Sequence, residues 1–104
     1  MEKTRLETLK EMLGSNPDDT FTRYAVGLEY VSNEMYDEAA GIFEELIAAD
    51  PNYHPSYYRL GKVYELLGDI ERAKKIYEKG IYVTTQQSEM HAREELQAAL
   101  NELL

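Results

Sequence analysis

The sequence predicts an all-α protein built as a stack of antiparallel helical hairpins, and three observations support this. Similar residues recur at an interval of 34 positions along the chain. Within each interval the apolar residues lie three or four positions apart, which is the period of an amphipathic helix. Proline, glycine and capping residues fall between the periodic segments, where a hairpin would turn. We therefore expect a single domain over residues 1–104, a right-handed superhelical stack of about six helices.

The 34-residue interval is carried mainly by aromatic and small residues. It pairs Tyr24 with Tyr58, Gly27 with Gly61, Tyr30 with Tyr64, Ala39 with Ala73, Phe43 with Tyr77 and Pro17 with Pro51. The interval predicts two full repeats, residues 20–53 and 54–87, and each repeat is a hairpin of two helices.

The two ends complete the stack. Residues 1–19 fit the second helix of a repeat whose first helix is missing, and Gly14 and Pro17 mark its end. Residues 88–104 fit a final amphipathic helix with Ser88 as its N-cap. Pairs of repeats are marginal on their own, so these end helices are expected to close the core. The expected helices lie at 3–13, 20–33, 36–49, 54–67, 70–83 and 88–103.

Small residues inside the helical segments predict where the helices approach closely. Gly27 and Gly61 each cost about 1 kcal/mol relative to alanine in a helix interior, so their presence at equivalent places suggests a close contact. Ala39 and Ala73 would be small partners on the returning helices, and aromatic residues would fill the wider gaps. The predicted repeat-packing residues are Gly27, Tyr30, Ala39, Phe43, Pro51, Gly61, Tyr64, Ala73 and Tyr77.

Two segments carry a resemblance to a known family. YAVGLEYVSNEMYDEAAGIFEELIAADP (24–51) and YRLGKVYELLGDIERAKKIYEKGI (58–81) resemble the tetratricopeptide repeat family in their order of small and large residues. The chain departs from that pattern at a few positions. Arg23 and Tyr57 stand where the family often has Trp, Leu46 and Gly80 replace its second-helix Ala, and Thr85 replaces its closing Pro.

The composition and charge of the chain argue against several classes of function. A net charge of −9 argues against a general nucleic-acid binder and against docking to anionic lipid. There is no cysteine, and His54 and His91 are 37 positions apart without a catalytic or metal-ligating partner in a recognisable spacing. The charged N-terminus does not read as a signal peptide, so the cytoplasm is the expected location. We expect no enzyme activity, no cofactor and no metal.

The resemblance implies a protein-interaction module with a concave groove lined by the first helix of each hairpin. It places nine residues in that groove: Phe21, Tyr24, Leu28, Val31, Pro55, Tyr58, Arg59, Lys62 and Glu65. Arg59 and Lys62 share one helix face and form a cationic spot in an acidic chain. They suggest a site for an acidic peptide. Tyr24, Leu28 and Tyr58 stand where family members that clamp a C-terminal carboxylate have polar or basic groups, so a full clamp is not expected.

Two alternatives stay open at this point. Tyr24 and Tyr58 either contact a protein or peptide partner or pack only on the neighbouring helix. The end helices could instead serve a structural homodimer or larger homo-oligomer, if apolar surface remains on them.

Overall fold

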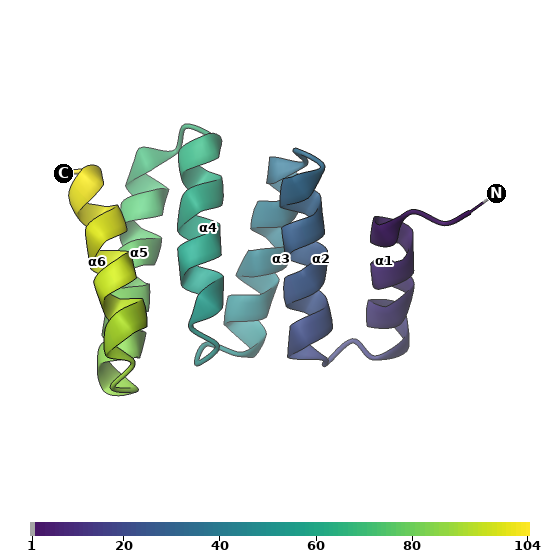
Figure 1. Ribbon diagram of the computed structural model, residues 1–104, viewed down its shortest axis with the longest axis horizontal. Helices are drawn as coiled ribbons and strands as arrows, with labels where there is room; N and C mark the ends of the chain where they lie inside the picture. Colours follow the sequence, from purple (N-terminus) through teal and green to yellow (C-terminus); the bar gives the residue numbers. More distant parts are fainter. Residues whose placement is uncertain (1) are drawn as a thin grey trace.

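The computed structural model describes residues 2–104, which fold into six α-helices with no β-strand among them. The predicted all-α fold is confirmed. The helices stand side by side in a row from α1 to α6, and the chain begins and ends at opposite ends of that row (Figure 1). The molecule measures 47 × 28 × 20 Å. The helices are α1 Arg5–Ser15, α2 Thr20–Ser32, α3 Tyr36–Ala49, α4 Pro55–Leu66, α5 Ile70–Gln86 and α6 Met90–Glu102.

Each helix packs mainly on its neighbours in the chain. Helices α2 and α3 form one hairpin and α4 and α5 the next, while α1 packs on α2 and α6 packs on α5. Helix α6 also touches α4. The helices therefore form a single row. The first helices of the two hairpins are α2 and α4, and α6 follows the second hairpin at the C-terminal end of the row.

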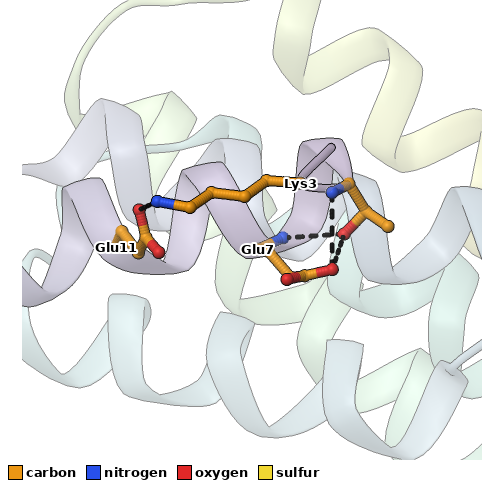
Figure 2. A network of polar contacts seen from close by, with 4 residues as sticks. Lys3, Glu7 and Glu11 are labelled. Carbon is orange, nitrogen blue, oxygen red and sulfur yellow. Dashed lines mark hydrogen bonds and ion pairs between the residues drawn. The ribbon is translucent and has the colours of Figure 1, made fainter. Parts of the chain in front are cut away.

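The first helix begins at a well-formed cap (Figure 2). The backbone N–H of Glu7 donates to Thr4 Oγ1 at 3.1 Å, and the backbone N–H of Thr4 donates to Glu7 Oε1 at 3.4 Å. This reciprocal capping box satisfies two N–H groups that a helix start leaves without partners. Lys3 precedes the helix, and its Nζ lies 2.8 Å from Oε2 of Glu11 on α1. The cap explains why α1 begins at Arg5, two residues later than expected.

Helix α5 is three residues longer than expected because no proline ends it. The first repeat closes with Pro51, whereas the equivalent position is Thr85. The hydroxyl groups of Thr84 and Thr85 donate to the carbonyls of Gly80 and Ile81, at 2.8 and 2.6 Å, inside the extended helix.

The turns between helices contain three residues with positive φ. These are Glu34 at 58°, Gly68 at 79° and Ser88 at 58°. The prediction that Ser88 is the N-cap of the last helix is therefore wrong. Glu89 holds that position and α6 begins at Met90. In the second hairpin, Asp69 accepts a hydrogen bond from the backbone N–H of Arg72 at 3.1 Å and caps α5.

In the core of each hairpin, a glycine of the first helix packs against an aromatic ring of the second helix. A Cβ added to Gly27 would lie 2.5 Å from the ring of Phe43, and one added to Gly61 would lie well inside van der Waals distance of Tyr77. Ala39, Ala73, Phe43 and Tyr77 are fully buried. The side-chain atoms nearest to each added Cβ thus belong to the aromatic residue of the returning helix.

Two of the expected packing residues lie closer to the surface. Tyr30 is half-buried, and Lys10 Nζ lies 6.0 Å from its ring centroid. Pro51 is exposed, because it sits in the turn between hairpins. Its carbonyl, rather than its ring, ties the repeats together by accepting a hydrogen bond from Tyr57 Oη at 2.6 Å.

Candidate functional site

A hollow of about 320 Å³ is lined by residues of α2, α4 and α6 and by His54 and Glu89, which precede α4 and α6. Four of the nine residues predicted for the groove line it: Tyr24, Pro55, Tyr58 and Arg59. The other lining residues are His54, which precedes α4, and Glu89, His91, Ala92, Glu95 and Leu96 at the start of α6.

The cation of the hollow is Arg59, whose Nε donates to Tyr24 Oη at 3.0 Å. This bond joins α4 to α2 and orients the guanidinium, which is exposed. Over residues 2–104, no carboxylate oxygen lies within ion-pair distance of Arg59. The charge of Arg59 is therefore available to an anion.

Both tyrosines line the hollow and also pack on neighbouring rings. The ring of Tyr24 lies 5.8 Å from Phe43 and 5.4 Å from Tyr53, in edge-to-face geometry. Tyr58 lies 6.5 Å from Tyr77. Each tyrosine thus packs on a neighbouring ring and also lines the hollow, and its contact with a partner stays a prediction.

Lys62 and Glu65 lie apart from the hollow and engage each other. Lys62 Nζ lies 3.6 Å from Glu65 Oε2 and 5.5 Å from the centroid of Tyr58. Glu65 also accepts a hydrogen bond from Tyr77 Oη. Within the described chain, Lys62 is thus partly neutralised, and Arg59 is the stronger anion site of the two.

The remaining groove residues divide between surface and core. Phe21 is 72% exposed, and its ring meets Tyr53 edge-to-face at 5.9 Å. Leu28 and Val31 are half-buried and pack against the core. These three residues do not line the hollow.

The sequence prediction missed the wall supplied by α6, because that helix was taken only as a cap. Its buried residues Leu96, Ala99 and Leu100 match Leu60, Val63 and Tyr64 of α4 at an offset of 36. Helix α6 therefore takes the place of the first helix of a third repeat. The longer α5 shifts the register by two residues, which hid this match at an interval of 34.

Burial and a carboxylate neighbour raise the pKa of Tyr77. Burial of the phenol is the larger cause, followed by its hydrogen bond to Glu65 and the charge of that group. Native Tyr77 thus keeps its proton at alkaline pH, whereas the unfolded chain releases it near the ordinary pKa of 10.0.

We expect folding stability to fall as pH rises above 10, because the native state then binds more protons than the unfolded state. Tyr77 alone contributes a slope of up to about 1.4 kcal/mol per pH unit. Urea midpoints of the Tyr77→Phe variant should decline less steeply than those of the parent between about pH 9 and pH 11. Tyr82→Phe, at a 65% exposed side chain, is the control and should follow the parent. Parallel curves for the parent and Tyr77→Phe would contradict this account.

Among the described residues, no helix combines the length and the apolar character that a membrane span requires. Residues 2–104 also contain no group of three or more His, Cys, Asp or Glu side chains arranged to hold a metal ion.

The repeats, their packing and their spacing define an α-helical repeat protein. The sequence model of the tetratricopeptide repeat family matches residues 30–100, so the chain belongs to that family. Domains of this fold generally mediate protein–protein interactions and are typically non-catalytic.

Relatives of known sequence or structure agree with this assignment. A TPR repeat-containing protein of Pseudomonas aeruginosa is 26% identical over 98 residues, which cover 94% of this chain and 93% of that protein. A tetratricopeptide repeat domain protein of Salinibacter ruber is 38% identical, with a TM-score of 0.80 over 85% of this chain and 89% of that chain. The TPR2B domain of yeast Sti1, solved in complex with pHsp70, has a TM-score of 0.87 at 14% identity, over 94% of this chain and 78% of that chain. At that identity the likeness shows the fold alone.

Proposed function

We propose that the protein binds a short peptide segment of a partner protein in the hollow between α2, α4 and α6, with an acidic group of the peptide beside Arg59. The single observation that carries this proposal is Arg59 itself. Its guanidinium is exposed and lines a hollow beside aromatic residues. A hydrogen bond of 3.0 Å from Arg59 Nε to Tyr24 Oη orients it. Arginine and tyrosine are the residue types that most often anchor protein interfaces.

The charge of the whole chain restricts the partner. With a net charge of −9, the protein repels a broadly acidic surface. A short segment with one localised acidic group avoids most of that repulsion while still reaching Arg59. The TPR2B domain of yeast Sti1 is one example in which a domain of this fold holds a partner.

The homodimer alternative rests on apolar side chains that the end helices expose, Met12 on α1 and Met90 on α6. The exposed sides of the same helices also carry charged residues, among them Glu7 and Glu11 on α1 and Glu94 and Glu102 on α6, so we favour the peptide site. Polar outer faces of this kind are typical of the helices that end a stack of repeats.

The test uses two capped peptides whose termini carry no charge: a hexapeptide with adjacent Phe and Glu, and the same peptide with Gln in place of Glu. Each is titrated into isotope-labelled protein and followed by NMR. We expect chemical shift changes around Tyr24, Tyr58 and Arg59, with tighter binding of the Glu peptide. Arg59→Glu should weaken that peptide about tenfold, because a charge-assisted hydrogen bond is lost and repulsion is added.

Lys75→Glu is the matched control, since Lys75 is an exposed cation on α5 that does not line the hollow. Equal losses from Arg59→Glu and Lys75→Glu would show a diffuse electrostatic effect instead of a site. Thermal unfolding of both variants should stay close to that of the parent. Shift changes confined to other faces would move binding away from the hollow.

A further inference from the structure

The hollow has two walls of opposite charge. Arg59 faces it from α4, while Glu89 and Glu95 face it from the start of α6. Glu95 Oε1 lies 2.8 Å from Nε2 of His91, which also lines the hollow. In residues 2–104, no ion pair within 4.0 Å joins Arg59 to either glutamate. Charges of both signs therefore line the hollow, and Arg59 forms no direct ion pair with either glutamate.

Between the charged walls the lining is mainly apolar. Pro55 and Tyr58 contribute from α4, and Ala92 and Leu96 from α6. Pro55, Tyr58 and Ala92 are half-buried, so each has surface to offer, whereas Leu96 is almost fully covered. An apolar or aromatic side chain of a ligand would bury area against this floor.

We infer that the hollow selects a bipolar peptide segment: one apolar or aromatic side chain on the floor, an acidic residue on the side of Arg59, and a basic residue on the side of Glu89 and Glu95. This inference rests on the proposed function and goes beyond it, since a site built on Arg59 alone asks only for an acid.

The physical reason is that both walls act on any ligand charge in so small a space. At 0.1 M salt, charges within about 10 Å of each other still interact, so a ligand charge in a hollow of about 320 Å³ is affected by the charged groups of both walls. A uniformly acidic peptide gains attraction from Arg59 but meets repulsion from the glutamates. A uniformly basic peptide is attracted by the glutamates but repelled by Arg59. Only a ligand with both charges is attracted by both walls, so the walls provide specificity by rejecting the wrong charge pattern.

The experiment compares four capped peptides of equal length around the same central Phe. They carry Glu then Lys, Lys then Glu, Glu on both sides, or Lys on both sides of that residue. Affinities are measured by NMR titration at about 50 mM salt, where screening is weak. We expect one of the two mixed orders to bind about two- to fivefold more tightly than either uniform peptide. The preferred order reports the direction in which the peptide crosses from α4 to α6.

Isosteric variants assign the effect to α6. In the double variant Glu89→Gln with Glu95→Gln, the all-Glu peptide should match or exceed the mixed peptides. The double variant Glu94→Gln with Glu102→Gln is the control, because these exposed glutamates are on the same helix but do not line the hollow. It should keep the parent's preference for the mixed peptide.

The outcomes separate this inference from the proposed function. Tighter binding of the all-Glu peptide to the parent protein would overturn the bipolar site and leave the acidic-peptide site standing. Equal losses of preference from both glutamine variants would also overturn it, because the effect would then come from net charge. If none of the four peptides shifts residues of the hollow, both proposals fail.

Discussion

We expect the Leu96→Ala variant to lose about 2–5 kcal/mol of unfolding free energy, because truncating a buried leucine removes apolar contacts and leaves a cavity. Leu96 is 1% exposed and fills the junction between α6 and α5. There its Cδ1 would lie 2.9 Å from a Cβ added to Gly80, so the two helices meet without a gap. A loss of this size would show that α6 is an integral part of the core.

Urea unfolding followed by circular dichroism measures this effect. Met90→Ala is the control, since Met90 lies on the same helix but is 53% exposed. We expect its midpoint to change little. If Leu96→Ala and Met90→Ala had the same small effect, α6 would not close the core in solution.

The second large effect is expected at Gly61, where alanine should destabilise the protein by about 1–3 kcal/mol through overpacking. The new Cβ would overlap the van der Waals surface of the Tyr77 ring, which is fully buried and has little room to move. Gly61→Leu should cost more, because a larger side chain meets the same ring. Gly27→Ala, facing Phe43, should act in the same direction.

Gly41→Ala supplies a control of opposite sign. Gly41 is exposed inside α3, and a Cβ there would have no neighbour within 4 Å. We expect a gain of about 0.5–1 kcal/mol, because alanine has the better helix propensity. Denaturant midpoints of the two variants, measured side by side, test the assigned packing. A stabilised Gly61→Ala would mean that the register of the second hairpin is wrong.

The repeat interval predicted the fold well because it records packing that both hairpins share. Gly27 and Gly61 face aromatic residues, and this demand shows directly in the sequence. Helix boundaries were predicted less accurately where a single local interaction decides them. Helix α1 begins after its cap at Thr4, later than predicted, and α5 is longer than predicted because Thr85 stands in place of a proline.

The candidate site was predicted only in part, and the reason is geometric. Tyr24, Tyr58 and Arg59 could be placed from the repeat pattern of the first helices. Glu89 and Glu95 could not, because their place depends on the two-residue shift that the longer α5 imposes on α6. The pairing of Lys62 with Glu65 was also missed, although a spacing of three on one helix is a usable signal for it.

The row of neighbour-to-neighbour contacts has a consequence for how the molecule opens. Helix α1 packs on α2 and contains no buried residue, whereas every later helix contributes to the core. In such a one-dimensional array, a terminal unit can detach without breaking contacts elsewhere. Amide hydrogens of α1 should thus exchange with solvent through fraying, and those of α4 and α5 only through global unfolding. The hollow lies away from α1, and its wall on α6 is anchored by the buried residues Leu96, Ala99 and Leu100, so we expect its walls to stay preorganised while α1 opens and closes.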